Sequence, residues 1–129
     1  MLPAVDVAFL ESKSLAHTVA IDAGMICVTV PQFVLPTGLS VLKADLMLRL
    51  SPGYPDVPPD MWWFYPAVFR ADGSRIEATE SIEHHFGRDW QRWSRHLDAQ
   101  RWMAGIDSLE SYFALIANEL RKAATRMAA

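Results

Sequence analysis

Residues 42–50 show the clearest alternation of apolar and polar side chains in the chain. Leucine or alanine stands at every second position, and the positions between carry Lys43, Asp45, Met47 and Arg49. Side chains alternate between the two faces of a strand, so this period of two predicts an antiparallel strand. One face is expected to lie on a core and the other to be half exposed.

A helical period marks the C-terminal part of the chain. Apolar side chains recur there at intervals of three and four residues: Leu109, Tyr112, Phe113, Ile116 and Leu120. This spacing predicts a long helix with one apolar face. Asp107 is expected to cap it, with Glu110 as the partner in a capping box.

Shorter segments complete the predicted fold. Residues 3–13 are expected to form a short helix, and residues 16–22, 25–30 and 61–65 are expected to form strands. Turns are predicted at Ala23-Gly24 and Asp72-Gly73. Strands followed by a long helix predict an α+β domain, with a four-stranded antiparallel meander packed on the C-terminal helix.

Two segments lack regular periodicity. Ser51–Asp60 holds four prolines and a glycine, which exclude a helix or an interior strand. Residues 74–104 are polar and show no clean period. A long irregular segment inside a compact domain is usually functional, so an irregular active-site segment is expected there.

Composition and charge narrow the classes of function. The chain has 129 residues, 51% of them hydrophobic, which suits one domain that needs no disulfide or metal to fold. Its single cysteine, Cys27, excludes an internal disulfide and a cysteine-based zinc site.

A net charge of −3 without a concentrated basic face disfavours nucleic acid binding. No apolar stretch reaches the roughly 18 residues of a membrane span, and no signal peptide is evident, so a cytoplasmic location without a membrane partner is expected.

The densest group of reactive side chains spans Trp90 to His96 and reads WQRWSRH. One interpretation makes Ser94 a nucleophile, with His96 or His84 as its base and Arg95 or Arg92 stabilising an oxyanion. The structural interpretation is an aromatic anchor that pins a loop, with arginines stacked on rings.

Two other kinds of site are weaker candidates. Glu80, His84 and His96 could be assembled into a zinc site, but nothing in their spacing enforces it, and no metal or cofactor is predicted. Cys27 stands among strand-forming residues, so it is expected to be buried and structural.

The order of these features resembles the ubiquitin-conjugating enzyme superfamily, specifically a divergent bacterial branch of the prokaryotic family E type. The turn Tyr54-Pro55-Asp56-Val57-Pro58-Pro59 follows an alternating strand, as in that superfamily, and Trp102 precedes the long helix. Ser94 lies eight positions before Trp102, where the family has its catalytic cysteine. His84 stands where the family's His-Pro-Asn motif begins, but histidine and phenylalanine follow it. The resemblance covers about residues 16–127 of one domain, 1–129.

The resemblance implies a carrier in a bacterial modification pathway, with antiviral defence as one role to consider. Such a carrier accepts the C-terminus of a ubiquitin-like protein from an adenylating, ThiF-like activating enzyme. A deconjugating protease is a further implied partner. With serine as nucleophile, the intermediate would be an oxyester on Ser94, supported by His96, His84 or Arg95. The positions expected to contact partners are Tyr54, Pro58, Pro59, Trp93 and Trp102.

Two alternatives remain open. The chain could be a non-catalytic module that binds a ubiquitin-like protein or supports a conjugation complex, because both the cysteine and the asparagine of the family motifs are missing. Ser94 could also be an engineered replacement of cysteine.

Overall fold

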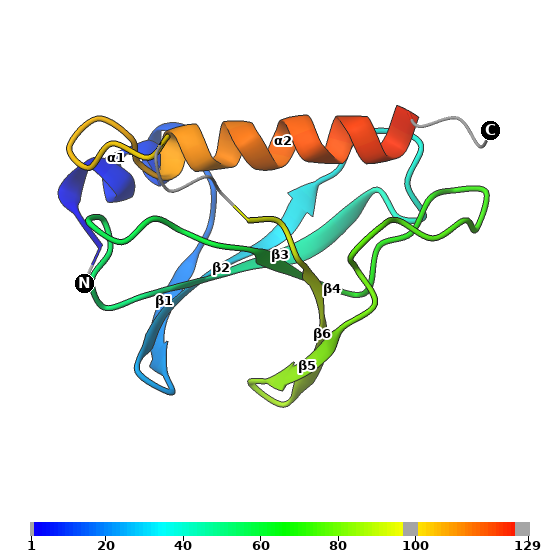
Figure 1. Cartoon of the computed structure of the whole chain (residues 1–129), viewed down its shortest axis with the longest axis horizontal. Helices are drawn as coiled ribbons and strands as arrows, with labels where there is room; N and C mark the ends of the chain where they lie inside the picture. Colours follow the sequence, from blue (N-terminus) through cyan, green and yellow to red (C-terminus); the bar gives the residue numbers. More distant parts are fainter. Residues whose placement is uncertain (1, 97–100, 126–129) are drawn as a thin grey trace.

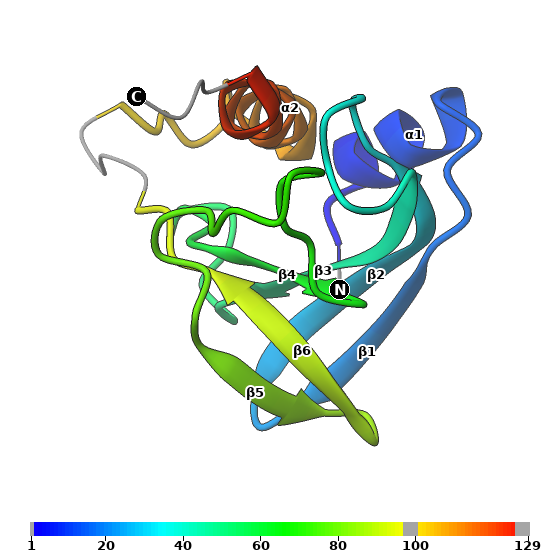
Figure 2. The same ribbon diagram turned by 90° about the vertical axis from the view of Figure 1, so that its right-hand side faces the viewer.

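A computed structural model describes residues 2–96 and 101–125; residues 97–100 and 126–127 of the predicted core lie outside this range. The elements in chain order are α1 (Ala4–Ser12), β1 (Thr18–Asp22), β2 (Met25–Val34), β3 (Lys43–Leu50), β4 (Trp62–Tyr65), β5 (Ile82–His85), β6 (Arg88–Trp93) and α2 (Leu109–Thr125). The α2 helix lies along one face of a curled sheet, and α1 lies beside the first turns of α2 (Figure 1, Figure 2). In the described ranges no helix is long and apolar enough to cross a bilayer.

The α+β class with an antiparallel sheet and a C-terminal helix is confirmed, but the sheet formed by the described residues has six strands rather than four. The strand order is β1-β2-β3-β4-β6-β5, and every neighbouring pair is antiparallel. The predicted turns at Ala23-Gly24 and Asp72-Gly73 are both present.

The two extra strands come from the segment that was expected to be irregular. β5 and β6 form a hairpin in which Glu83 lies opposite Trp90 and His84 lies opposite Asp89. The hairpin turns at Phe86 and Gly87, whose φ values are 53° and 74°. Such a turn usually carries Asn-Gly, and a bulky residue with positive φ is uncommon, so the Phe-Gly pair gave no turn signal.

β2 also runs further than its β-branched stretch predicted. It continues past Pro31 through an irregularity between Val30 and Phe33. Gln32 takes a φ of 55° there, and its N–H donates to the Asp45 carboxylate at 2.9 Å. A bulge of this kind accommodates a proline because the missing N–H would otherwise leave a gap in the ladder.

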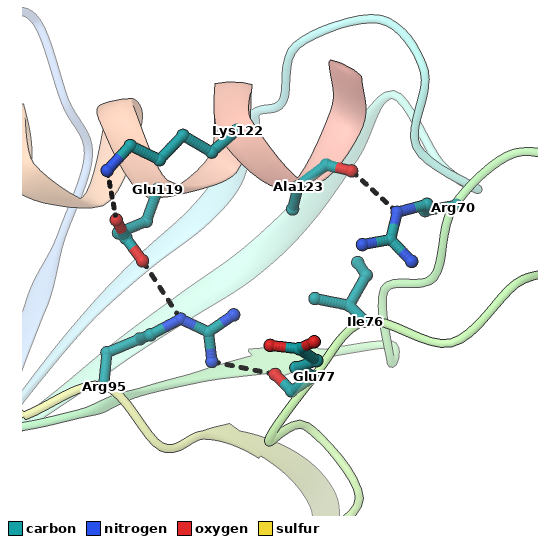
Figure 3. Close-up of a pocket in the computed structure, with 7 residues that line it drawn as sticks. All are labelled: Arg70, Ile76, Glu77, Arg95, Glu119, Lys122 and Ala123. Carbon is teal, nitrogen blue, oxygen red and sulfur yellow. Dashed lines mark hydrogen bonds and ion pairs between the residues drawn. The ribbon is translucent and has the colours of Figure 1, made fainter. Parts of the chain in front are cut away.

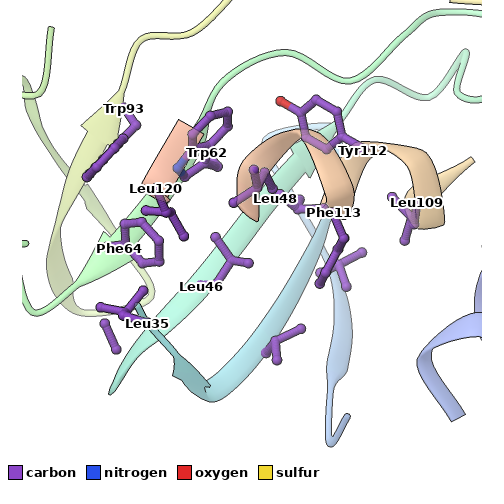
Figure 4. Packing of buried hydrophobic residues seen from close by; sticks show 14 of the residues in the cluster. Leu35, Leu46, Leu48, Trp62, Phe64, Trp93, Leu109, Tyr112, Phe113 and Leu120 are labelled. Atoms are coloured by element: carbon purple, nitrogen blue, oxygen red, sulfur yellow. The ribbon is translucent and has the colours of Figure 1, made fainter. Parts of the chain in front are cut away.

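The main core lies between the sheet and α2 (Figure 4). Leu46 and Leu48 of β3 belong to the same buried cluster as Leu109, Phe113 and Ile116 of α2, as the two periodicities predicted. Leu42 was expected on this face but is 71% exposed, because β3 begins only after it.

The face of β3 that was expected to be half exposed is so at Lys43, Asp45 and Arg49, but Met47 is buried in a second cluster. This cluster consists of Cys27, Met47, Trp63 and Trp90. Met47 alternates with the core leucines along β3, so this cluster lies on the side of the sheet away from α2. Trp63 of β4 and Trp90 of β6 bring two large rings to this cluster, and the pairing of β4 with β6 could not be known before the hairpin was known.

The predicted capping box of α2 is wrong. Ser108 is the capping residue: its Oγ accepts from the Glu110 N–H at 3.3 Å, and Ser111 Oγ accepts from the Ser108 N–H at 3.0 Å. The Asp107 carboxylate instead accepts from the Met103 N–H at 2.8 Å. Serine and aspartate are both good N-cap residues, so the sequence could not distinguish two adjacent candidates.

Candidate functional site

Ser94 directly follows β6, and its surroundings hold both its backbone and its hydroxyl. Its N–H donates to the Ala78 carbonyl at 2.9 Å, which keeps the chain close to residues 78–81 after the strand ends. Its Oγ accepts a hydrogen bond from Arg92 Nε at 3.1 Å. The side chain is half-buried. A cation on the hydroxyl oxygen favours negative charge there, which is what a nucleophilic serine needs.

Arg95, although next in sequence, points the other way. Its Nε donates to Glu119 of α2 at 3.1 Å, and its Nη1 donates to the Glu77 carbonyl at 2.9 Å. Its guanidinium also lies over the Trp93 ring, 5.1 Å from the centroid. Figure 3 shows the contacts of Arg95 with Glu119 and Glu77 in the wall of a cavity of about 140 Å³ between α2 and the 70–77 segment. The structure therefore brings Arg92, rather than Arg95, to the Ser94 hydroxyl.

Neither predicted base is hydrogen-bonded to Ser94 in the described residues. His96 Nδ1 lies 3.1 Å from Asp60 Oδ1, and the imidazole is 71% exposed. His84 Nδ1 lies 3.0 Å from Asp89 Oδ1 at the hairpin end of β6. Asp89 and Ser94 are separated by the length of the strand, roughly 17 Å at about 3.3 Å per residue. His96 therefore remains close to Ser94 along the chain, whereas His84 lies at the opposite end of β6.

The candidate zinc ligands are also separated. The two histidines pair with different aspartates, and Glu80 lies 3.6 Å from Arg75. Within residues 2–96 and 101–125, no group of three or more histidine, cysteine, aspartate or glutamate side chains could hold a metal ion.

Several residues expected to contact partners are buried inside the domain. Trp93 is 0% exposed, Tyr54 is 7% exposed, and Pro59 is buried as well. Trp102 Nε1 donates to the Pro55 carbonyl at 2.8 Å, and its ring lies 6.1 Å from that of Tyr54. These contacts join the proline-rich turn to the segment before α2.

The surface beside this junction is formed by other side chains. Pro58 and Trp102 remain half-buried, and Val57, Met103 and Ile106, which are close to them in sequence, are exposed. Among the expected partner-binding positions, only Pro58 and Trp102 therefore keep part of their surface available to a partner.

Glu83 is a site residue that the sequence did not indicate. Its carboxylate accepts from Arg92 Nη1 at 2.8 Å and from Trp63 Nε1 at 3.0 Å, and His85 Nε2 lies 2.9 Å away. Burial alone would raise the pKa of Glu83, but hydrogen bonds from His85, Trp63 and Arg92 outweigh it and hold the pKa below its usual value. Glu83 could have been identified as a site residue only if the pairing of β5 with β6 had been known, because that pairing brings it to Arg92.

Cys27 is buried, as predicted, with 1% of its surface exposed. Arg49 Nη1 donates to its sulfur at 3.4 Å. Burial raises the pKa of the thiol, although the nearby Arg49 charge acts in the opposite direction. A buried thiol with a raised pKa is a poor nucleophile.

Comparison with known protein families gives a match over most of the chain. The model of a family described as Prokaryotic E2 family E matches residues 2–123, which include both Ser94 and Trp102. Searches of curated proteins and of solved structures found no match.

Proposed function

The chain belongs to prokaryotic E2 family E, and from this premise we propose that it carries a ubiquitin-like protein as an ester on Ser94. Membership of the family implies a carrier role, with a ubiquitin-like protein and an activating enzyme as partners. The finer assignment is an adenylating, ThiF-like activating enzyme as the donor. A deconjugating protease would act in the same bacterial pathway.

The observation that carries the proposal is the hydrogen bond from Arg92 Nε to Ser94 Oγ, at 3.1 Å. A serine hydroxyl is a weak nucleophile at neutral pH and needs both a base and stabilisation of its negative charge. Arg92 would supply the second requirement at Ser94, the residue that we propose stands in the position of the family's catalytic cysteine.

The proposed step is an acyl transfer. Ser94 Oγ attacks the activated carbonyl carbon at the C-terminus of the ubiquitin-like protein and forms a carbon–oxygen bond. The bond between that carbon and the activating enzyme's leaving group breaks, and the leaving group takes the electron pair. The hydroxyl proton passes to a base and then to the leaving group. An amine of the target later attacks the same carbon and forms an amide; the bond from that carbon to Ser94 Oγ breaks, and the proton lost by the amine returns to Oγ.

His96 is the proposed base. Asp60 binds its Nδ1, which favours a proton on that nitrogen and leaves the lone pair on Nε2. His96 follows Ser94 by two residues, and we propose that movement of this exposed side chain brings Nε2 to the hydroxyl. His96→Ala is expected to slow ester formation by about 10²–10⁴-fold.

A specific observation favours a second function, a non-catalytic module that binds a ubiquitin-like protein. In the described residues the Ser94 hydroxyl is bonded to an arginine and to no histidine. In this alternative the Arg92–Ser94 contact only stabilises the end of β6.

Mapping the adduct by mass spectrometry separates the two functions. The protein is mixed with ATP, a ubiquitin-like protein and its activating enzyme. The carrier function predicts an adduct on Ser94 that resists thiols but is cleaved by hydroxylamine. Ser94→Ala should abolish it, and Ser94→Cys should give an adduct that thiols cleave.

Ser12→Ala on α1, an exposed serine, is the matched control and should behave as the wild type. If the wild type and Ser94→Ala behave alike, the chain is the non-catalytic module.

A further inference from the structure

We propose that Arg92 binds the negative charge that develops beside Ser94 Oγ during acyl transfer, and that Glu83 and Ser81 are positioning residues that hold Arg92 there. The inference rests on the proposed function for its biological meaning. The hydrogen bonds among four side chains support it: Arg92, Ser94, Glu83 and Ser81.

The guanidinium of Arg92 is fixed through all three of its nitrogen atoms. Nε donates to Ser94 Oγ at 3.1 Å, Nη1 to Glu83 Oε2 at 2.8 Å, and Nη2 to Ser81 Oγ at 3.2 Å. The Arg92 backbone N–H also donates to the Ser81 carbonyl at 2.8 Å. A planar group held on three sides keeps its orientation, so its Nε–H remains directed at the Ser94 oxygen.

Glu83 is itself held in place by its neighbours. Trp63 of β4 donates to the Glu83 carboxylate at 3.0 Å, and this tryptophan is 5% exposed. His85 lies 2.9 Å from the same carboxylate and 3.8 Å from Asp22 of β1. Side chains from β1, β4 and β5 therefore contribute to the position of Arg92. A contact that only stabilised the end of β6 would not need so many partners.

The arrangement matches the chemistry of the step. Arg92 stays protonated throughout, because an arginine side chain does not lose its proton in proteins, and it contributes only hydrogen bonds and charge. The Ser94 proton leaves for the base, and the charge on Oγ and on the adjoining acyl oxygen develops beside a donor that is already oriented. Arg95 cannot replace it, because its guanidinium is bonded to Glu119 and Glu77 on the α2 side.

The first test needs no partner protein. Ser94→Cys in a Cys27→Ala background places one thiol at position 94, and its alkylation by iodoacetamide is measured against pH. We expect a thiol pKa below the usual value of about 8.5. Adding Arg92→Gln should slow alkylation at pH 7 by about three- to tenfold, because the thiolate fraction falls as the pKa rises.

Arg95→Gln is the matched control, since it removes the same charge one residue away. It should leave the alkylation rate unchanged within about twofold, and urea denaturation checks that every variant is folded. Equal responses to Arg92→Gln and Arg95→Gln would overturn the role of Arg92.

Glu83→Gln tests positioning by the sign of its effect. Removing a negative charge should by itself lower the thiol pKa and speed alkylation, whereas loosening Arg92 should slow it. We expect slower alkylation, partly restored by Glu83→Asp, and a smaller slowing from Ser81→Ala. An unchanged or faster rate in Glu83→Gln would show that Glu83 does not position Arg92.

The adduct assay then separates this inference from the proposed function. In the wild-type background, Arg92→Gln should slow Ser94 ester formation by about 10²–10³-fold, as does loss of an oxyanion donor. An ester that forms on Ser94 at an undiminished rate without Arg92 overturns the inference and leaves the carrier function standing. A wild type that forms no ester, together with an Arg92-dependent thiol pKa, overturns the carrier function and supports Arg92 as the anion-stabilising group.

Discussion

At the scale of single residues, the contacts around Ser94 and Cys27 give these two candidate nucleophiles opposite characters. Ser94 stands at a strand end, half-buried, with a cation on its oxygen. Cys27 lies inside a strand among tryptophan and methionine side chains, where burial disfavours the thiolate. The environment therefore favours charge at the serine and suppresses it at the cysteine, although a thiol is intrinsically the better nucleophile.

Cys27→Ala is expected to leave adduct formation unchanged. The sulfur is buried and fills part of the second cluster, so its loss should appear in stability rather than in transfer. The rate of adduct formation with the activating enzyme is the measurement, and a urea midpoint provides the stability comparison. Loss of the adduct in Cys27→Ala would mean that the nucleophile has been wrongly assigned to Ser94.

At the scale of elements, the β5–β6 hairpin and α2 lie on different sides of the site. The hairpin supplies Glu83 and Arg92 on the face away from α2. The helix holds Arg95 through Glu119 on the other side. Ser94 follows the strand that separates them, so each neighbouring arginine belongs to a different layer of the molecule.

Phe113→Ala is expected to cost about 3–5 kcal/mol of unfolding free energy, because it removes a buried aromatic side chain from the interface of α2. Phe113 is 7% exposed and contacts the rings of Phe9 and Phe33, at centroid distances of 5.5 and 6.0 Å. Urea denaturation provides the measurement. Asn118→Ala, on the exposed face of the same helix, should change stability by only about 0.5 kcal/mol. A loss below about 1 kcal/mol for Phe113→Ala would show that this face of α2 does not carry the packing.

Glu83 is expected to make the hairpin sensitive to acid. Its folded-state pKa lies below the ordinary value of 4.5, so its carboxylate stabilises the fold above that pH. This contribution is lost as the pH falls through the lowered pKa. The stability of the wild type should therefore fall more steeply below about pH 4.5 than that of Glu83→Gln, as measured by urea denaturation across pH. Parallel curves for the two proteins would contradict the lowered pKa.

At the scale of the whole molecule, the buried Asp6 links three parts of the chain. It is 1% exposed; one oxygen accepts from the Tyr54 hydroxyl at 2.7 Å and the other from the Leu109 N–H at 2.9 Å. The α1 helix, the proline-rich turn and the start of α2 thus meet at one carboxylate. Burial and the adjacent Asp6 raise the pKa of Tyr54, so the tyrosine stays protonated and continues to donate.

Asp6→Ala is expected to reduce the unfolding free energy by about 2–4 kcal/mol, because it leaves a buried hydroxyl and a buried N–H without their acceptor. Urea denaturation measures the loss. Asp56→Ala, an exposed aspartate in the proline-rich turn, is the control and should have an effect within about 0.5 kcal/mol. Similar effects of the two substitutions would show that the junction at Asp6 does not hold the three segments together.

The sequence by itself determined the elements whose side chains repeat with a period. The alternation in β3 and the three-and-four spacing in α2 predict both elements, because each buries one continuous apolar face. The proline-rich turn and the family resemblance are equally local, since they depend on residue types at short spacings. These signals were sufficient for the α+β class and for the family.

Only the tertiary structure decided which side chains meet. The hairpin that holds Glu83 turns at Phe-Gly, a pair without a turn signal, so two strands were missed. Arg92 and Arg95 are equivalent as residue types, but Arg92 points to one face of β6, whereas Arg95 follows the end of the strand and turns towards α2. The partner of each arginine therefore depends on what lies across the sheet, Glu83 on one side and Glu119 on the other.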